Sequence, residues 1–184
     1  LEGLPYPLFI KTRFDIGIKK IAKVNNPEEL KQLLRVTEKP IIQEYLDGEE
    51  YTVDILADLS GKVIMTSPRR RLEVREGIST KGITVKNELL SKLAAACVEA
   101  FPLPGVSNVQ IIVDQSQNRL CVVDVNPRFA AGGLPLAIAA GFNIPDLLIK
   151  LLLGQPLKIV EPEAGLVMMR YWHTVCVRSD QLVN

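Results

Sequence analysis

The chain has 184 residues, of which 47% are hydrophobic and 23% are charged, and 22 Lys and Arg residues nearly balance 21 Asp and Glu residues. This composition is typical of one globular domain or two small ones, and a net charge of +1 does not indicate a nucleic-acid partner or a charged membrane surface. No apolar run is long enough to span a bilayer and no secretory signal opens the chain. Because the sequence begins at Leu1 and not at Met, we expect a fragment of a longer protein.

The cysteines and the histidine exclude several kinds of site. Three cysteines are widely spaced without a CxxC pair, and His173 is the single histidine. A disulfide framework and a Cys/His zinc site are therefore disfavoured, and we expect a reduced, cytoplasmic setting. A Ser-His-Asp triad would have to use His173, and no G-x-S-x-G motif precedes it.

The first 49 residues predict a small layer of strands with one helix. Strands are expected at residues 7–12, 19–24 and 40–46. Asn26 is expected to cap the helix, because Pro27 suits the first helical position and Glu29 has the capping-box spacing. The apolar stripe of this helix is formed by Leu30, Leu33 and Leu34.

From residue 50 the pattern changes to longer strands. In chain order we expect strands at 50–58 and 62–74, a loop at 75–82, a helix at 88–101, hairpin strands at 107–114 and 119–126, and helices at 134–141 and 144–154. Asn87 is expected to cap the first of these helices, and Gly154 to end the last. The apolar face of the 88–101 helix is expected to comprise Leu90, Leu93, Ala94, Cys97, Val98 and Phe101. Residues 155–184 are not assigned to an element.

The predicted hairpin gathers polar side chains on one face. If Asp114 pairs with Leu120 across the turn, the register of the whole antiparallel pair is fixed. Side chains two residues apart share a face, and cross-strand partners are close neighbours. Two polar pairs then lie side by side: Gln110 opposite Asp124, and Asn108 opposite Asn126.

Two interpretations of this patch remain open. The sequence DVNP alone favours an Asx-type strand exit before Pro127. The amide and the carboxylate that face each other across the hairpin favour a site for a hard cation such as Mg²⁺. That ion takes oxygen ligands and commonly uses one or two carboxylates together with nucleotide phosphates.

The sequence SNVQIIVD…NRLCVVDVNPR resembles the end of an ATP-grasp domain, especially that of the carbamoyl phosphate synthase large chain and its smaller ligase relatives. Their pattern is a Gln, a hairpin, and then Glu-x-Asn-Pro-Arg. The resemblance implies Mg²⁺, with Mn²⁺ as an alternative, on Gln110, Asp124 and Asn126. It also implies Arg128 as a catalytic residue near the transferred phosphate. Asp124 departs from the pattern, because the family usually has the longer Glu there.

The sequence IIQEYLDGEEYTVDIL is similar to the adenine hinge and ribose contact of the same family. The resemblance implies a hinge made of Gln43, Glu44 and Leu46, with Glu50 as the ribose residue. A carboxylate can accept hydrogen bonds from both ribose hydroxyls. Without the resemblance, a surface turn at residues 47–48 flanked by solvated acids explains the segment equally well.

Lys11 ends the first predicted strand, where the family has a Lys or Arg that contacts the nucleotide phosphates. The resemblance therefore implies that Lys11 is both a nucleotide-binding and a catalytic residue. Without the resemblance, Lys11 is interpreted as a lysine at a sheet edge whose methylene groups pack on apolar surface while its ammonium group stays in water. The loop that follows has one glycine, Gly17, where the family has several. Lys19 and Lys20 are expected to substitute as point charges.

The arginine run Arg69–Arg71 remains open between a solvated face and contacts with substrate or phosphate. Alternation along a strand puts Arg69 and Arg71 on one face and Arg70 on the other. By resemblance, Ser79 and Thr80 fall in a loop near the reacting groups.

Taken together, the resemblance implies an α/β (α+β) ATP-grasp fold with two αβ subdomains that sandwich ATP. Residues 1–49 would form the lid and adenine hinge, and residues 50–160, with a mostly antiparallel sheet, the metal and phosphate site. Residues 161–184 would be a C-terminal extension, and the family's additional N-terminal domain is expected to be absent. The sheet flank that this domain would have covered is then exposed, and a homo-oligomer is expected as one way to cover it.

The implied activity is ATP-dependent ligation. A small carboxylate is phosphorylated to an acylphosphate, and an amine, ammonia or a thiol then displaces the phosphate. We expect the fragment to bind ATP weakly with little turnover alone. Two alternatives remain: a nucleotide-binding module without catalysis, and a partner-binding remnant that binds no nucleotide.

Overall fold

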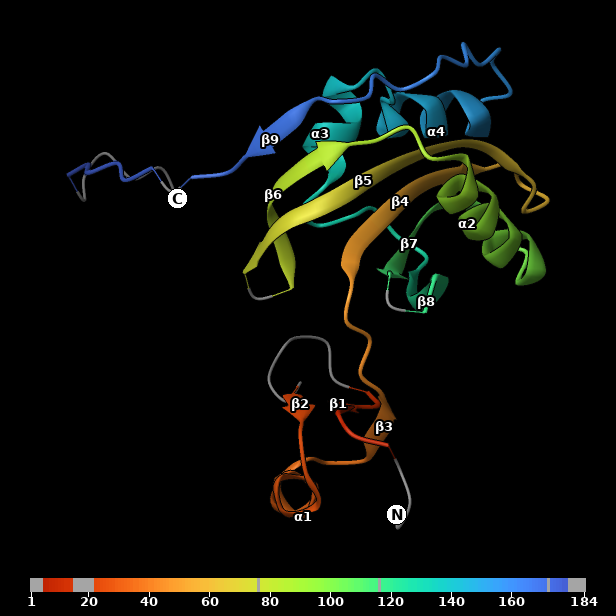
Figure 1. The fold of residues 1–184 in the computed structure, drawn as a ribbon. Coiled ribbons are helices and arrows are strands. Elements are labelled where there is room, and N and C mark those ends of the chain that lie inside the picture. The colour runs from red at the N-terminus through yellow and green to blue at the C-terminus, as the bar shows by residue number, and fades with distance from the viewer. Residues whose placement is uncertain (1–4, 15–21, 76, 116, 172, 179–184) are drawn as a thin grey trace.

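The computed structural model describes residues 5–14, 22–75, 77–115, 117–171 and 173–178. Figure 1 shows a small sheet and a large sheet, which are joined by the segment between β3 and β4. The small sheet and its helix comprise β1 (Leu8–Thr12), β2 (Ala22–Val24), α1 (Pro27–Val36) and β3 (Pro40–Glu44). The remaining elements are β4 (Glu49–Ala57), β5 (Val63–Arg75), β6 (Ile78–Thr84), α2 (Glu88–Ala100), β7 (Gly105–Asp114), β8 (Arg119–Asn126), α3 (Leu134–Ala139), α4 (Ile144–Leu152) and β9 (Val167–Met169).

The small sheet has the order β2-β1-β3 with antiparallel pairs, and α1 packs against it. As predicted, Asn26 caps α1, because its side chain accepts a hydrogen bond of 3.0 Å from the backbone N–H of Glu29. In a capping box the Glu29 carboxylate would accept a hydrogen bond from the backbone N–H of Asn26. Here it accepts from the backbone N–H of Asn25 instead, at 2.8 Å. The predicted second strand is confirmed for residues 22–24, and residues 19–21 lie outside the described residues.

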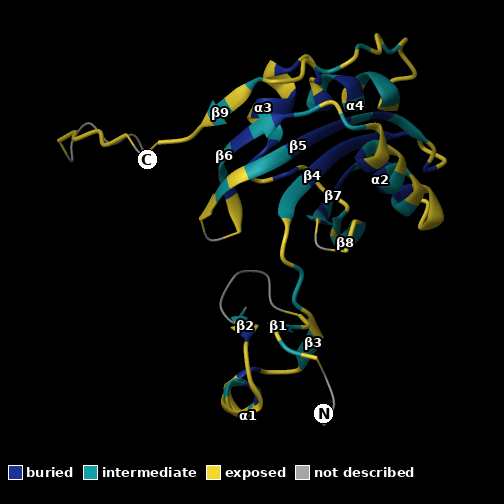
Figure 2. Cartoon of the chain, viewed as in Figure 1, coloured by how far each residue is buried: buried dark blue, intermediate teal, exposed yellow. Residues whose placement is uncertain are grey.

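The large sheet has the order β8-β7-β4-β5-β6-β9, and all its described pairs are antiparallel. Side chains of β4 alternate between its two faces. Val53 and Ile55 pack in the cluster that includes residues of α2, whereas Leu56 packs in the cluster that includes residues of α3 and α4. Figure 2 shows the buried residues concentrated in this sheet and in the helices that cover it.

Polar side chains share the face of β4 that carries Leu56. Thr52 and Asp54 are buried there, closer to the small sheet than the apolar cluster of α3 and α4. A buried polar group needs a hydrogen-bonding partner, and the Asp54 carboxylate finds one in the Nε of Arg69 on the neighbouring strand β5. Gln110 lies opposite Thr52 on this face and opposite Asp124 on the other side, so the predicted metal ligands lie on this part of the sheet.

Two expectations about the large sheet are corrected, and part of the tail is placed. Residues 78–84 form strand β6, not a loop, because pairing with β5 outweighs the low strand propensity of Lys81 and Gly82. Phe101 is 69% exposed and does not face the core, because it is the C-cap of α2 and its backbone has left the helical conformation. Part of the unassigned tail forms β9, which pairs with β6 and extends the sheet.

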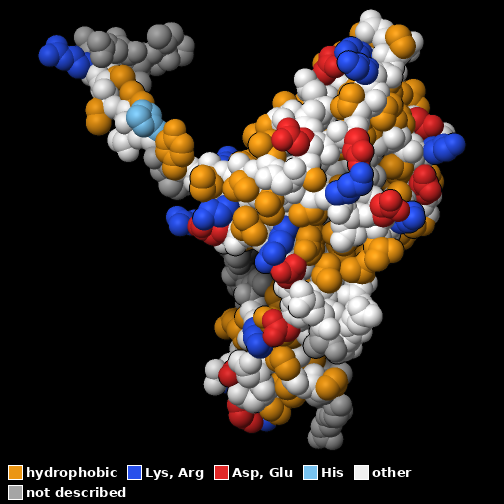
Figure 3. Space-filling view, turned by 45° about the horizontal axis from the view of Figure 1, so that its top comes forward, with side chains coloured by type: hydrophobic (Ala, Val, Ile, Leu, Met, Phe, Trp, Pro, Cys, Tyr) orange, Lys and Arg blue, Asp and Glu red, His pale blue; other side chains and the backbone are white. Residues whose placement is uncertain are grey.

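The chain continues beyond β9 as an extended segment. Figures 1 and 3 show it projecting from the rest of the molecule, with hydrophobic side chains exposed along it. No helix in the described ranges is long and apolar enough to cross a membrane.

Candidate functional site

The hairpin of β7 and β8 brings the predicted polar patch together. Asn108 lies opposite Asn126 and Gln110 lies opposite Asp124, as the sequence predicts. The predicted pairing is wrong nearer the turn, because Asp114 lies opposite Arg119 and not Leu120. A β-bulge after Gln110 absorbs the one-residue difference. The polar pairs therefore face each other although β8 carries one residue more than a regular ladder allows.

The patch is hydrogen-bonded within itself. The Asn126 Nδ2 donates to Asp124 Oδ2 at 2.8 Å, and Arg128 Nη2 donates to Asn126 Oδ1 at 3.1 Å. The Oε1 of Gln110 accepts from Arg71 Nη1 at 3.2 Å. The structure thus brings together the three side chains predicted to hold a metal, the predicted catalytic Arg128, and an arginine of β5.

The chemistry of these donors fits a hard cation. Gln110, Asp124 and Asn126 offer one carboxylate and two amide oxygens, and each of these side chains accepts a bond from an N–H donor. No group of three His, Cys, Asp or Glu residues suited to a metal occurs in the described part of the chain. A cation here would therefore depend on amide oxygens and on oxygens from a ligand such as a phosphate.

Arg71 connects two predicted site residues that lie on different strands. Its Nη1 forms an ion pair with Oε1 of Glu50, and its Nη2 donates to the backbone oxygen of Gly77 at 2.7 Å. The Arg71 side chain is 5% exposed. Burial lowers the pKa of its guanidinium, and the Glu50 carboxylate opposes that shift. The sequence predicts that Arg71 shares a strand face with Arg69, but it does not predict the contacts of Arg71 with Glu50 and Gln110.

The arginine run is not a solvated face. The Nε of Arg69 donates to Oδ2 of Asp54 at 2.9 Å, with both side chains almost completely buried. Arg70 points to the other face, where it pairs with Glu49 at 2.8 Å. The alternation predicted for the run is therefore confirmed.

A small cavity lies beside the patch. Its volume is about 50 Å³, and three of its lining residues are arginines: Arg69, Arg71 and Arg128. The other lining residues are Thr52, Gly77, Ser79, Asn108, Gln110, Ala130, Ala131 and Gly132. Asp54 and Glu50 balance the charges of Arg69 and Arg71, so these two guanidinium groups offer N–H donors around the space, and Arg128 adds a further positive charge at its edge.

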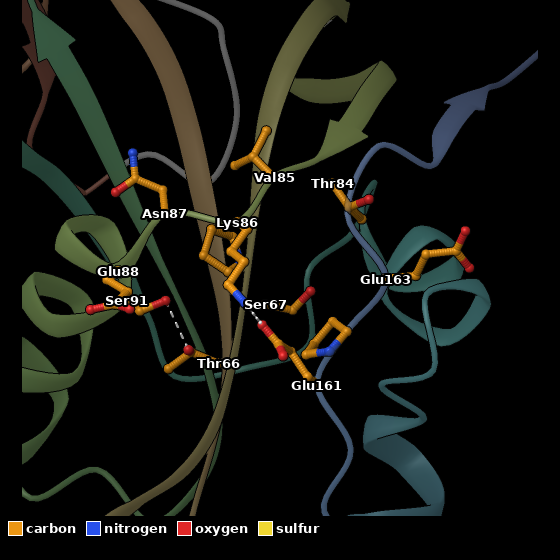
Figure 4. A pocket seen from close by; sticks show the side chains of 12 residues that line it. Thr66, Ser67, Thr84, Val85, Lys86, Asn87, Glu88, Ser91, Glu161 and Glu163 are labelled. Atoms are coloured by element: carbon orange, nitrogen blue, oxygen red, sulfur yellow. Dashed lines mark hydrogen bonds and ion pairs between the residues drawn. The ribbon is translucent and has the colours of Figure 1, made fainter.

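A larger cavity of about 220 Å³ lies elsewhere on the large sheet (Figure 4). It lies between β5, the start of α2 and residues 161–163. Lys86 pairs with Glu161 at its edge at 2.5 Å, and Thr66 donates to Ser91 at 3.0 Å. None of the site residues predicted from the sequence lines this cavity.

The predicted hinge lies at the end of β3 and in the segment that follows. Gln43 and Glu44 are the last two residues of β3, and Leu46 follows in the connection to β4. The Glu44 carboxylate accepts two hydrogen bonds from Arg119 of β8, at 3.0 and 2.8 Å. This bidentate pair connects the two sheets, and the hydrogen bonds to Glu44 raise the pKa of the Arg119 guanidinium.

Lys11 lies on β1 opposite Ile41 of β3 and is half-buried. It therefore belongs to the small sheet, whereas the hairpin patch belongs to the large one. The loop residues Gly17, Lys19 and Lys20 lie outside the described residues. Ser79 lines the small cavity from β6 and donates to the backbone oxygen of Lys81 at 3.1 Å, and Thr80 donates to the backbone oxygen of Glu73 at 3.4 Å.

The chain is similar in sequence and in fold to several known proteins. The chain is 29% identical over 187 residues to the carbamoyl phosphate synthase large chain of Thermoanaerobacter sp. (strain X514), covering 89% of this chain and 16% of that protein. Its fold is similar to that of the biotin carboxylase domain of 2-oxoglutarate carboxylase from Hydrogenobacter thermophilus, with a TM-score of 0.71, 17% identity and coverage of 89% and 40% of the two chains.

A further solved structure of similar fold is N5-carboxyaminoimidazole synthetase from Staphylococcus aureus, with a TM-score of 0.61, 22% identity and coverage of 85% and 43%. The chain therefore spans less than half the length of each of these proteins. The family described as "ATP-grasp in the biosynthetic pathway with Ter operon" matches residues 37–174. With this match over well more than half of its length, an ATP-grasp fold and the hairpin pattern, the chain belongs to the ATP-grasp family.

Proposed function

We propose that this chain is the nucleotide-binding part of an ATP-dependent ligase that joins a carboxylate to an amine or to ammonia through an acylphosphate. The observation that carries the proposal is the gathering of Gln110, Asp124, Asn126 and Arg128 beside a cavity lined by arginines. Residues 1–49 would act as the nucleotide lid and hinge, and residues 50–160 as the metal and phosphate side.

In this proposal the adenine edge is read by the segment 43–46. The Glu44 carboxylate is already held by Arg119, so the Gln43 amide and the backbone up to Leu46 would be the parts of the segment that pair with adenine. Glu50 would accept from the ribose hydroxyls. Its ion pair with Arg71 orients the carboxylate and couples it to Gln110. Lys11 would bind phosphate from the small sheet.

Mg²⁺, with Mn²⁺ as an alternative, would be held by Gln110, Asp124 and Asn126. When bound, the ion would supply neutralisation of the phosphate charge. Arg128 would stabilise the charge of the phosphoryl group as it is transferred, since its guanidinium already donates to the adjacent Asn126.

The cavity lined by Arg69, Arg71 and Arg128 would accept the carboxylate head of the acceptor. An oxygen of that carboxylate would attack the γ-phosphorus and form a P–O bond, while the bond to the leaving ADP oxygen breaks. The amine nitrogen would then attack the acyl carbon, phosphate would leave with the bonding electrons, and the nitrogen would lose a proton. A volume of about 50 Å³ suits a small carboxylate group and not a whole large substrate.

Titration calorimetry with ATP, in the presence and absence of Mg²⁺, tests the binding part of the proposal. We expect binding that tightens when Mg²⁺ is present. Absence of binding under both conditions would favour a partner-binding role. Measurement of ADP release with small carboxylates then separates a ligase from a nucleotide-binding module without catalysis. The Asp at position 124 is the specific observation that favours such a module, because a shorter acid reaches less far toward a second ion.

A further inference from the structure

The loop between β8 and α3 carries Arg128 and is hydrogen-bonded to strand β7 of the large sheet. The side-chain Nδ2 of Asn108 donates to the backbone oxygen of Arg128 at 2.9 Å. Asn108 lies on β7 and is 3% exposed. The bond therefore connects a buried, rigid strand to the backbone of the residue whose guanidinium lies at the polar patch.

Two glycines of the same loop lie closely against the sheet. A Cβ at Gly132 would lie 2.8 Å from the backbone nitrogen of Ser79, and a Cβ at Gly133 would lie 2.0 Å from Cζ of Arg69. Arg69 cannot easily move away, because Asp54 holds its Nε at 2.9 Å. The C-terminal half of the loop is thus fixed by close contact, and the Asn108 hydrogen bond fixes its N-terminal half.

Asn108 has the position of a metal ligand but makes a different contact. It lies two residues before Gln110 and opposite Asn126, so strand geometry includes it in the polar patch. Its amide N–H nevertheless points to the loop, where it satisfies the carbonyl of Arg128. A side chain that is committed to a backbone carbonyl acts on the position of that backbone.

We propose that Asn108 is the positioning residue for Arg128: its hydrogen bond to the Arg128 carbonyl sets where the guanidinium stands relative to Asn126 and the arginine-lined cavity. Only the contact of Arg128 with a phosphate rests on the proposed function. The hydrogen bond and its effect on the loop do not depend on that function.

The first experiment measures the loop in the nucleotide-free protein. Hydrogen exchange of peptides covering residues 127–133 is compared between the wild type and the variants Asn108→Leu and Asn108→Asp. Leu cannot donate the hydrogen bond and Asp can donate it only when protonated, so the exchange is measured at neutral and at alkaline pH, and a fold defect from a buried carboxylate would affect only the second variant. We expect roughly three- to tenfold faster exchange in this loop, as the loss of one hydrogen bond allows, with unchanged exchange in α2.

Ser107→Ala is the matched control. Ser107 is the preceding residue on β7 and is also buried, but its Oγ has no hydrogen-bond partner among the described residues and it points to the other face of the strand. We expect wild-type exchange in the loop for this variant. Unchanged loop exchange in Asn108→Leu and Asn108→Asp would overturn the proposal, as would equal acceleration in Ser107→Ala.

The second experiment measures the consequence for Arg128. The ratio of ATP to ADP affinity reports contacts with the γ-phosphate, and we expect both Asn108→Leu and Arg128→Ala to lower it. The double variant should lower the ratio no further than Arg128→Ala alone, because Asn108 acts through Arg128. Additive losses would contradict a positioning role. If the wild type binds no nucleotide, the proposed function fails, and the exchange experiment still decides whether Asn108 positions the loop.

Discussion

Asp124 is an exposed carboxylate at the end of β8, and its Oδ2 accepts a hydrogen bond from Asn126 at 2.8 Å. Because it is exposed, its removal should cost little stability. We expect Asp124→Ala to abolish the Mg²⁺-dependent part of ATP binding while the thermal midpoint stays near that of the wild type, and calorimetry with a thermal melt measures both. Asp146→Ala, which removes a carboxylate on α4, serves as the control. Wild-type binding of Mg·ATP by Asp124→Ala would refute the metal assignment.

The longer acid offers a second test of the same residue. Asp124→Glu restores the family's usual residue, so we expect it to retain or raise Mg²⁺-dependent binding. Complete loss of binding in this variant would mean that the pocket is built for the shorter side chain.

Glu50 is half-buried, and its carboxylate pairs with the buried guanidinium of Arg71. We expect Glu50→Ala to weaken ATP binding more than binding of inorganic triphosphate, which has no ribose, and calorimetry with the two ligands gives the comparison. Glu50→Gln is the matched variant, because it keeps the shape and an acceptor for Arg71 but loses the charge. Equal losses for ATP and triphosphate would mean that Glu50 acts through Arg71 and the phosphate side of the site.

At the scale of the elements, the turn between β4 and β5 is held by one carboxylate. Asp58 Oδ1 accepts from the Ser60 hydroxyl at 2.6 Å, from the Ser60 backbone N–H at 2.8 Å and from the Lys62 backbone N–H at 2.9 Å. These bonds lower the pKa of Asp58, and the bond from the Ser60 hydroxyl has the largest effect.

The sign of the resulting pH dependence follows from that shift. A carboxyl with a lower pKa in the folded state stabilises the fold above its unfolded pKa, and this contribution is lost as the pH falls through the folded pKa. We expect NMR titration to give Asp58 a pKa below the ordinary aspartate range. Asp58→Asn should lose this part of the acid dependence of stability, and an unshifted Asp58 would contradict the prediction.

The start of α3 depends on the absence of a side chain at Gly133. A Cβ there would lie 2.0 Å from the guanidinium of Arg69, which is buried and paired with Asp54. We expect Gly133→Ala to lower the free energy of unfolding by about 3 kcal/mol or more, because the Arg69–Asp54 pair must be broken or the loop displaced. Urea denaturation measures the loss.

Gly154→Ala is the control for that prediction. Gly154 has φ of +65°, and apart from its chain neighbours no heavy atom of the described residues lies within 4 Å of the position that a Cβ would take there, so backbone strain is what opposes the substitution. We expect a loss of about 1 kcal/mol. Equal losses for the two glycine variants would show that the contact with Arg69 is easily relieved.

At the scale of the whole molecule, two features join the sheets. Arg119 of β8 holds Glu44 of β3 through two hydrogen bonds and also donates to Asp114 at 3.2 Å. The connection between the sheets crosses β7 closely, because a Cβ at Gly48 would lie 2.2 Å from the backbone oxygen of Val113. From the ion pair and the close crossing together we expect restricted motion of the small sheet relative to the large one.

We expect Arg119→Ala to loosen this restriction with little loss of stability, since the Glu44 pair is partly exposed and such pairs contribute little to unfolding free energy. Limited proteolysis should cleave residues 45–48 faster than in the wild type, while the thermal midpoint changes little. Arg75→Ala is the control, because Arg75 pairs with Glu73 within one strand. Unchanged cleavage in Arg119→Ala would mean that the connection itself holds the sheets together.

The sequence by itself determined the local elements and the faces of their side chains. Asn26 and Asn87 cap helices as predicted, because capping depends on residues within one turn. The polar face of the hairpin and the split of the arginine run also follow from a period of two along a strand. Membership of the ATP-grasp family could likewise be read from the hairpin motif, because its residues are close in sequence.

Only the tertiary structure decided which of these faces meet. Arg71 joins Glu50 to Gln110, Asn108 holds the loop of Arg128, and Arg119 reaches Glu44. Each contact connects residues that are 20 or more positions apart, and the pairing of β4 with both β5 and β7 creates the two contacts of Arg71. Local periodicity carries no information about strand order, and the bulge in β8 and the strand β6 depend on partners that the local sequence does not specify.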